Sequence, residues 1–408
     1  MDDEQRQLGS ELAPSRTPKP KALYGTEIDA ASLTQLERCL GDERAVYGAL
    51  MADHHKGYAV PIGGVIAYQE AISPSGVGFD IACGNKAIRT DADWQEVRRN
   101  IAAIMDDVWR QISFGVGRKN EERVDHELFD DEAWKLPMLA PLKELARAQL
   151  GTVGSGNHYV DIFEDTQRRI WIGVHFGSRG LGHKTATWFL ERAGAKDGMD
   201  VDACVLDEKS NLGAEYIEAM RLAGRYAYAG RDWVAGKVAA ILGAKVEEEI
   251  HNHHNFAWRE EHAGLGAVWV VRKGATPAAP GQKGFVGGSM GEESVILEGI
   301  ECPESARSLY STVHGAGRVM GRMEAKGKVD RKTGAVLRPG KVSVEMMRDW
   351  VRASGVELRG AGVDESPHCY KRLPEVLAAQ GETICILERL KPIGVAMAGA
   401  DEFDPYKD

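Results

Sequence analysis

Short polar clusters, each beside a glycine or a tight turn, recur along most of the chain and constrain its fold more than any other feature. They carry the residue types that do chemistry, and they lie at residues 80–84, 154–158, 175–180, 253–255 and 311–318. Predicted helices and short strands alternate irregularly between them, and no internal repeat divides the chain. We therefore predict a single α+β domain, in which mixed strands and helices surround one central cleft.

The composition of the 408 residues indicates a folded protein. With 43% hydrophobic and 27% charged residues, the chain can bury a large core, which excludes wholesale disorder. No apolar run approaches the roughly 20 residues of a membrane span, and the polar start lacks a signal-peptide core. Six scattered cysteines indicate reduced thiols, so we expect a cytoplasmic protein without a membrane partner. The net charge of −10 argues against a protein that coats nucleic acid, but it allows a local basic groove.

Hydrophobic spacing predicts the main elements. Helices are predicted at residues 31–40, 91–112, 213–242, 343–354 and 372–380, and strands at 171–176, 250–258, 268–271, 294–297 and 383–387. In the strand at 171–176, Ile172, Val174 and Phe176 share one face, so His175 points to the other. Residues 277–291, which include seven glycines or prolines, are predicted to form a loop. The predicted domain spans 23–400, between a mobile polar tail at 1–22 and a short tail at 401–408.

His314 stands between a β-type segment and two glycines, in the run Ser311-Thr312-Val313-His314-Gly315-Ala316-Gly317-Arg318. Glycine lets the backbone approach a ligand closely, and a histidine beside it can act as nucleophile, acid, base or metal ligand. A turn histidine without a chemical role is the alternative. So short a motif does not decide between the two interpretations on its own.

The other clusters offer a mixed set of oxygen, sulfur and nitrogen donors. The donors are Asp80, Cys83, His158, His175 and a histidine of the pair 253–254. Imidazole and thiolate suit Zn, Fe, Co or Ni, and a carboxylate widens the choice to Mn. Five ligands exceed the four of a closed zinc site, but a shared thiolate allows two ions, a recurrent arrangement in phosphoryl transfer. Taken singly, a residue such as Asp80 or Cys83 is most often structural, because a free cysteine usually packs as a small buried hydrophobic side chain.

Two other groups of residues are less specific. The glycine-dense loop at residues 284–291 can form a phosphate-binding nest or a flexible surface loop, and it lacks the lysine of a P-loop. The remaining histidines that we considered are predicted to be exposed or held by structural contacts. They are His126, His183, His251, His262 and His368.

Taken together, the clusters resemble those of the RtcB family of RNA-splicing ligases over residues 51–399. Seven motifs occur in the family's order, at residues 78–84, 154–158, 175–180, 253–255, 272–275, 288–291 and 314–318. The resemblance implies an RtcB-like fold and an enzyme of RNA repair or tRNA splicing. Its substrates would be RNA ends with a 3′-phosphate, or a 2′,3′-cyclic phosphate, and a 5′-hydroxyl. It also implies GTP and two Mn²⁺ ions as cofactors, and it raises an archease-type activator as a partner.

The motif match also implies roles for individual residues. His314 would be the nucleophile that becomes a covalent histidine–GMP, because a neutral imidazole forms a P–N bond that is readily transferred. The implied metal ligands are Asp80, Cys83, His158, His175 and His254, with Cys83 shared between the ions. The implied nucleotide-binding residues are Asn157, His158, Tyr159, Asp161, His254, Asn255, Gly287, Gly288, Ser289, Met290, Ser294, His314, Gly315, Ala316, Gly317, Tyr370 and Ala398.

Two positions depart from the family where the guanine base is read. The family has a glutamate where this chain has Asp161, and a lysine where it has Ala398. Losing a hydrogen-bond partner at a buried base costs about 1–3 kcal/mol. We therefore expect weaker discrimination of GTP from other nucleotides than in the family.

Alternative functions remain open at this point. A divergent paralogue could keep the metals and act as a nucleotidyltransferase or phosphatase on another acceptor. A non-catalytic RNA-binding relative is the weaker alternative, because it would need neither the five ligand positions nor His314. The basic run at residues 322–341, with a hairpin turn predicted at 332–334, is either an RNA contact or a solvated hairpin.

Overall fold

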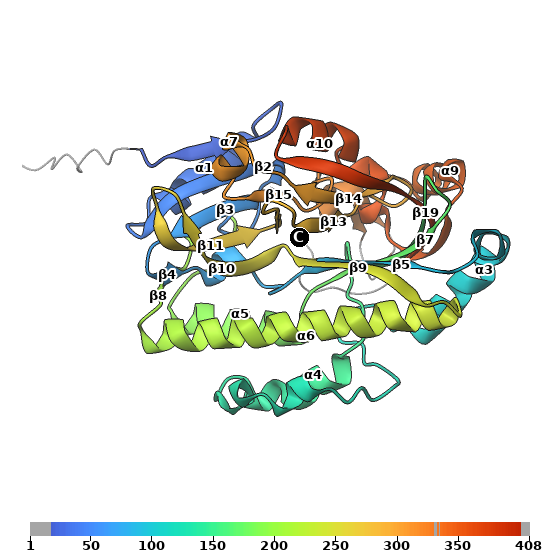
Figure 1. Ribbon diagram of the computed structural model, residues 1–408, viewed down its shortest axis with the longest axis horizontal. Helices are drawn as coiled ribbons and strands as arrows, with labels where there is room; N and C mark the ends of the chain where they lie inside the picture. Colours follow the sequence, from blue (N-terminus) through green and yellow to red (C-terminus); the bar gives the residue numbers. More distant parts are fainter. Residues whose placement is uncertain (1–17, 330–332, 334, 401–408) are drawn as a thin grey trace, which may run out of the picture.

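Two large mixed β-sheets, with helices packed along their outer sides, make up the computed structural model (Figure 1). The structure describes residues 18–329, 333 and 335–400. These residues form one α+β domain, which confirms the predicted fold class. Most of both predicted tails, at 1–17 and 401–408, lies outside the described residues, and the first strand begins at Lys21, inside the predicted N-terminal tail.

The first sheet has five strands in the order β1-β2-β3-β11-β10. Their bounds are β1 (Lys21–Leu23), β2 (Ala45–His55), β3 (Ile62–Tyr68), β11 (Gly266–Lys273) and β10 (Asn255–His262). Strand β1 runs parallel to β2, and the other pairs are antiparallel. Most of β2 and β3 is buried, because helix α1 (Ala30–Leu40) covers one side of them.

The second sheet has the order β13-β14-β19-β6-β7-β5-β9, and β18 pairs with β19 at its side. Its strands are β5 (Gly84–Thr90), β6 (Tyr159–Asp165), β7 (Ile170–Phe176), β9 (Val246–His253), β13 (Lys283–Val286), β14 (Ser294–Gly299), β18 (Glu357–Ala361) and β19 (Ile384–Gly399). In β7, Ile172, Val174 and Phe176 join one core cluster, while His175 lines a cavity on the other face. This confirms the alternation predicted for that strand.

Three strand pairs lie outside the large sheets. They are β4 (Ala71–Ile72) with β8 (Leu206–Asp207), β12 (Ala275–Pro277) with β15 (Ser311–Val313), and β16 (Gly327–Val329) with β17 (Val336–Pro339). The pair β12–β15 leads the chain into His314. The pair β16–β17 confirms a hairpin in the basic run, although most of its predicted turn at 332–334 lies outside the described residues.

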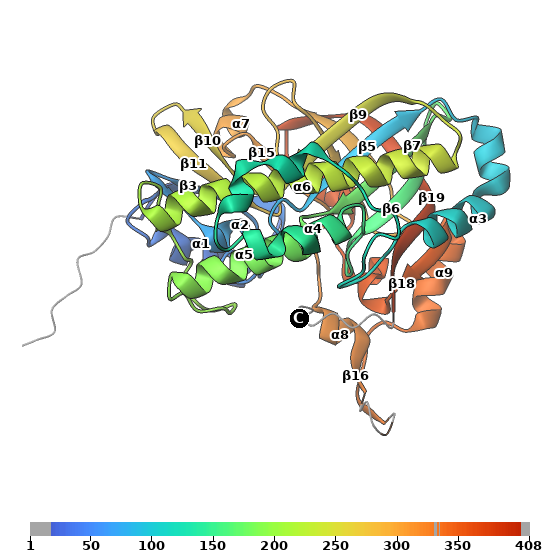
Figure 2. The same cartoon turned by 90° about the horizontal axis from the view of Figure 1, so that it is seen from below.

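The helices pack mainly against the outer sides of the sheets. Besides α1, they are α2 (Pro74–Val77), α3 (Trp94–Gln111), α4 (Lys143–Gln149), α5 (Arg179–Arg192), α6 (Asn211–Ile241), α7 (Pro303–Arg307), α8 (Arg322–Lys326), α9 (Val344–Ser354) and α10 (Leu373–Gln380). Helix α6 begins at an N-cap serine, Ser210, whose side chain accepts from the backbone N–H of Gly213. With α5 it runs along one side of both sheets, and its buried face contributes to two core clusters (Figures 1 and 2). Among the described helices, none is both long and apolar enough to cross a membrane.

Several predicted elements were wrong in extent. The strand predicted at 250–258 is two strands, β9 and β10, because the backbone N–H groups of His254 and Asn255 both turn to donate to the carbonyl of Cys83. The predicted loop at 277–291 contains β13, which pairs with β14. The strand predicted at 383–387 continues to Gly399, because a register shift at Pro392–Gly394 accommodates the proline. Helix α5 was not predicted.

Candidate functional site

A cavity of about 1510 Å³ lies where several strands of the two sheets end. Cys83 immediately precedes β5, His175 is the penultimate residue of β7, and His254 immediately follows β9. In the same way His158 precedes β6 and His314 follows β15. Strand ends that meet at one place bring together side chains that are far apart in the chain, and all five of these residues line the cavity.

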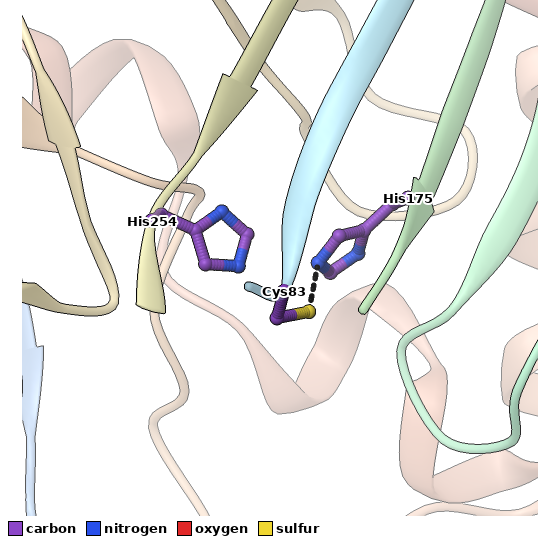
Figure 3. Close-up of side chains that lie close together, drawn as sticks. All are labelled: Cys83, His175 and His254. Atoms are coloured by element: carbon purple, nitrogen blue, oxygen red, sulfur yellow. Dashed lines mark hydrogen bonds between the residues drawn. The ribbon is translucent and has the colours of Figure 1, made fainter. Parts of the chain in front are cut away.

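Two groups of possible metal ligands share the thiol of Cys83. One group is Cys83, His175 and His254, and the other is Asp80, Cys83 and His158; in each, one ligand atom per residue lies within 4.8 Å of the others. Cys83 Sγ is 3.3 Å from His175 Nε2 and 3.5 Å from His158 Nε2, and His158 Nε2 is 3.0 Å from Asp80 Oδ2. Figure 3 shows the rings of His175 and His254 on either side of Cys83. The imidazole and thiolate donors suit a borderline ion such as Zn²⁺, and the carboxylate of Asp80 extends the choice to the harder Mn²⁺.

The surroundings prepare these residues for a cation. His175 Nδ1 lies 2.9 Å from the carbonyl oxygen of Asn157 and donates to it, which leaves Nε2 free to bind. Burial lowers the pKa of His175 and of His254 well below the usual value, so both rings are neutral. Burial and the neighbouring Asp80 raise the pKa of Cys83, so a bound cation must displace the thiol proton.

His314 stands beside this cluster, with a partner that the sequence did not reveal. Its Nδ1 lies 2.6 Å from Oδ2 of Asp53, a fully buried carboxylate at the end of β2. The same oxygen accepts from the backbone N–H of His314 at 3.0 Å and of Gly315 at 3.3 Å. Burial alone would raise the pKa of Asp53, but these interactions with His314 hold it below the usual value. The ring of His314 is 4.9 Å from the ring of His254, centroid to centroid.

Gly317 shows why the turn after His314 needs glycine. Its φ is +76°, and a Cβ there would lie 2.2 Å from the carbonyl oxygen of Asp53. Any other residue would therefore separate the histidine turn from β2. The only sequence signal for Asp53 is its place before two histidines, His54 and His55, at the end of an apolar run. His55 also lines the cavity, and burial lowers its pKa to about 4.

All the predicted site residues line this cavity except Ser294 and Ala398. Ser294 lies in β14, where its Oγ accepts from the backbone N–H of Gly288 at 3.0 Å, so it shapes the glycine loop. Ala398 packs into the core cluster on the α3 side of the second sheet, because β19 alternates and its neighbour Met397 faces the cavity. Neither residue therefore lines the cavity, and their assignment as nucleotide-binding positions stays a prediction.

Tyr370 belongs to a network of charged residues at the cavity rim. Arg318 donates from Nη1 to the hydroxyl of Tyr370 and from Nη2 to the carbonyl of Asp364, both at 2.8 Å. Glu365 accepts from Tyr370 and pairs with Arg322. The network fixes Arg318, four residues after His314, against the segment that carries Tyr370. Neither Asp364 nor Glu365 was predicted as a site residue.

The other histidines have structural contacts, as predicted. His126 accepts from the backbone N–H of Leu128, and His262 lies 2.9 Å from Glu260. His251 and His368 also have hydrogen-bond partners. His183 differs from the rest, since it both stacks on Phe79 and lines the cavity.

Asp161 lies in the cavity wall as a buried carboxyl. Its Oδ1 has no hydrogen-bond partner among the described residues, and neither does the hydroxyl of Tyr159 two positions earlier in β6. Burial raises the pKa of Asp161 well above the usual value. A carboxyl in a cavity wall whose oxygen lacks a protein partner can hydrogen-bond a ligand there.

The raised pKa of Asp161 makes a testable prediction about stability. The folded protein keeps a proton that the unfolded chain releases above about pH 4, so stability falls as pH rises from there through the folded-state pKa. We expect Asp161→Asn to increase the free energy of unfolding of the ligand-free protein by about 1–3 kcal/mol at neutral pH. The gain should vanish towards pH 4 in urea unfolding curves.

Asp165, in the same strand, is the matched control. Burial would raise its pKa, but Trp171 and Arg169 donate to it and hold the pKa below the usual value. Asp165→Asn should therefore destabilise the protein, and more so at neutral pH than at acidic pH. If the difference in unfolding free energy between Asp161→Asn and the parent did not change with pH, this account would be contradicted.

Comparisons with a family model and with individual known proteins all indicate the same family. A family model described as tRNA-splicing ligase RtcB matches residues 43–398. The RNA-splicing ligase RtcB of Escherichia coli K12 is 31% identical over 383 residues, which cover 85% of this chain and 88% of the relative. The tRNA-splicing ligases RtcB of Thermococcus kodakarensis and Archaeoglobus fulgidus are 30% and 31% identical, and each alignment covers 86% of this chain and 87% of the relative.

Proposed function

The chain belongs to the RtcB family of tRNA-splicing ligases, and on that basis we propose that it is a GTP- and Mn²⁺-dependent RNA ligase. It would join a 3′-phosphate, or a 2′,3′-cyclic phosphate, to a 5′-hydroxyl through a covalent histidine–GMP. The observation that carries this proposal is the position of His314. Its Nδ1 lies 2.6 Å from a buried carboxylate oxygen, and its ring lies beside a thiol–imidazole cluster in one cavity.

The arrangement supports His314 as the nucleophile. With Asp53 at Nδ1, the proton of the neutral ring belongs on that nitrogen, and Nε2 keeps its lone pair. Attack of Nε2 on the α-phosphate of GTP forms a P–N bond and releases pyrophosphate. A 2′,3′-cyclic phosphate would first be opened by water, which breaks its bond to the 2′-oxygen and leaves a 3′-phosphate. An oxygen of the RNA 3′-phosphate then takes the GMP and breaks the P–N bond. Attack of the 5′-hydroxyl on the activated 3′-phosphate finally releases GMP and leaves a phosphodiester.

Asp80, Cys83, His158, His175 and His254 would hold two Mn²⁺ ions, which when bound would neutralise phosphate charge. Other side chains fix the loops and the positive charges that would surround the phosphates. Asn255 accepts from the backbone N–H of Gly274 at 2.8 Å and donates to the carbonyl of Asp80 at 3.3 Å, so it ties the two loops together. Arg179 and Arg318 line the cavity as fixed cations.

A ligation assay tests the proposal. Purified protein is incubated with GTP, Mn²⁺ and two RNA strands that end in a 3′-phosphate and a 5′-hydroxyl, and the joined product is measured. Joining supports the proposal. Transfer of GMP to the protein without joining would favour the alternative, a nucleotidyltransferase that acts on another acceptor.

The same assay can report nucleotide preference. Asp161 is one methylene shorter than the family's glutamate, and Ala398 supplies no side-chain hydrogen bond. We therefore expect labelled ATP to modify the protein measurably, with a preference for GTP of about 10–100-fold. Asp161→Glu should raise that preference. Labelling by GTP alone in the parent protein would reject the idea.

The basic hairpin is our proposed contact for the RNA strand. Figure 2 shows α8 and β16 projecting from the body, and residues 319–322 at their base line the cavity. Lys328 and Arg338 are exposed on the two paired strands. Phosphate contacts weaken when the charge is reversed, so we expect Lys328→Glu with Arg338→Glu to reduce RNA affinity about tenfold and to flatten its salt dependence.

Fluorescence anisotropy with labelled RNA at several salt concentrations measures this effect. Lys135→Glu with Lys209→Glu, two exposed lysines that do not line the cavity, is the control with the same change in net charge. GMP transfer to His314 should be unchanged in both double variants. Equal RNA affinity in both would leave the hairpin as a solvated structure.

A further inference from the structure

Arg231, near the middle of α6, is a fully buried arginine that lies behind the cavity wall. Buried guanidinium groups are normally paired with a carboxylate. Within the described part of the chain, no carboxylate lies within ion-pair distance of Arg231. Burial lowers its pKa to about 10, so it is still charged at neutral pH. The hydrogen bonds of this buried cation must therefore offset the free-energy cost of removing it from water.

The donors of Arg231 are used on four neutral acceptors. Nη1 donates to the backbone carbonyl of Ala82 at 3.0 Å and also to that of Phe176. Nη2 lies 2.9 Å from Nδ1 of His253, and Nε donates to Nε2 of His251 at 2.8 Å. The planar guanidinium therefore connects three separate segments of the chain, and a lysine could not reproduce its fixed geometry.

Three of these acceptors are the chain neighbours of the three buried candidate ligands. The pairs are Ala82 beside Cys83, Phe176 beside His175, and His253 beside His254. The segments belong to the adjacent strands β7, β5 and β9. Because side chains alternate along a strand, His175 and His254 face the cavity, while their neighbours Phe176 and His253 face α6. His253 stacks on Tyr228 of α6, and the ring of Phe176 packs over Gly230.

The backbone conformation of Ala82 indicates that the chain next to Cys83 is held in a fixed position. Its φ is +62°, a left-handed conformation that residues other than glycine adopt only when their surroundings hold them there. The bond from Arg231 to the Ala82 carbonyl is one such restraint, and the bond from the Ala82 N–H to the carbonyl of Asn255 at 2.7 Å is another. The position of Cys83 therefore depends on contacts outside its own strand.

We propose that Arg231 is a positioning residue, which sets the spacing of Cys83, His175 and His254 by holding their three strand ends from the side away from the cavity. The inference rests on the proposed metal site and deepens it. Arg231 does not line the cavity, so it would touch neither a bound cation nor a nucleotide. Its effect is on how well the three ligand atoms are placed before a cation arrives.

Metal binding without nucleotide or RNA tests the role directly. Binding of Mn²⁺ is measured by the loss of the free-ion signal in electron paramagnetic resonance, and Co²⁺ binding by the thiolate-to-metal absorption band. We expect Arg231→Lys to weaken Mn²⁺ binding about 10–100-fold and to diminish the Co²⁺ band. Tyr226→Phe is the control, because it removes another buried hydrogen bond of α6, to the carbonyl of Ala146, and neither residue lines the cavity or adjoins a candidate ligand.

The control should lose thermal stability and keep the metal affinity of the parent. A folded Arg231→Lys with affinity within twofold of the parent, or equal weakening in Tyr226→Phe, would overturn the role of Arg231. If Arg231→Lys does not fold, two variants of His253 decide. His253→Leu removes one acceptor and should weaken Mn²⁺ binding, whereas His253→Asn restores an acceptor and should recover it.

Equal affinity of both His253 variants and the parent would contradict the inference. A parent protein that binds no Mn²⁺ would overturn the metal site together with the role of Arg231. Unchanged affinity in Arg231→Lys would overturn that role alone, so the two failures are distinguishable.

Discussion

His314→Ala is expected to lose the covalent nucleotide adduct completely and to reduce RNA joining by at least about 10³-fold. The methyl group of alanine has no nitrogen that could form the P–N bond, and removing a nucleophile from a group of residues that act together removes most of their combined effect. Labelled GTP followed by denaturing electrophoresis measures the adduct, and joined RNA measures the overall reaction. Metal affinity should be unchanged, because His314 is not one of the proposed ligands.

Asp53→Asn provides a graded comparison for the same site. The amide keeps the size of the carboxylate, but it removes the negative charge that holds the proton on Nδ1 of His314. We expect adduct formation to slow about 100-fold or more while the protein stays folded. Adduct formation in His314→Ala at the parent rate would show that another residue is the nucleophile.

Cys83→Ala is expected to weaken Mn²⁺ binding at both proposed positions by about 100-fold or more. Its thiol belongs to both ligand groups, so its loss removes one ligand from each. The increase in thermal unfolding temperature that Mn²⁺ produces in the parent should disappear, because a ligand stabilises a protein only as far as it binds the folded state. A titration monitored by electron paramagnetic resonance gives the stoichiometry and the affinity.

Cys204→Ala is the control for removing a buried thiol. Cys204 packs in the core cluster beneath α5 and α6 and does not line the cavity. Its loss should lower stability modestly and leave Mn²⁺ binding intact. Two ions bound at the parent affinity in Cys83→Ala would exclude a shared thiolate.

The spacing of apolar residues was sufficient to predict the helices that have one apolar face and a side-chain cap. The helix predicted at 91–112 is α3, and that at 213–242 is α6, since one apolar face and a side-chain cap are properties of the segment itself. The lengths of the strands could not be predicted in this way, because they depend on the neighbouring strands with which they pair. Strand β19 passes Pro392 because β6 pairs with it on both sides of a register shift, and no single strand contains that information.

The same distinction holds for the site: some of its features could be predicted from the sequence, and others required the tertiary structure. The donor types and the glycines around them were evident along the chain, and they were enough for a resemblance to one family and for the proposed ligands. Which member of a histidine pair faces the cavity required the register of β9 against β5, and the inward side of β19 required its register against β6. Asp53 and Arg231 carry no motif, because what they do depends on distances to residues far away in sequence.

The sequence by itself determined the chemistry that is available: a histidine in a glycine turn, a thiol, three further imidazoles and an aspartate. The tertiary structure decided which of these meet, by bringing the starts of β5 and β6 and the ends of β7, β9 and β15 to one cavity. It also placed Asp53 against His314 and turned Ala398 away from the cavity. The physical reason is that residue type sets what a group can bind or attack, whereas distance and burial, which set its pKa and its partners, exist only once the strands have paired.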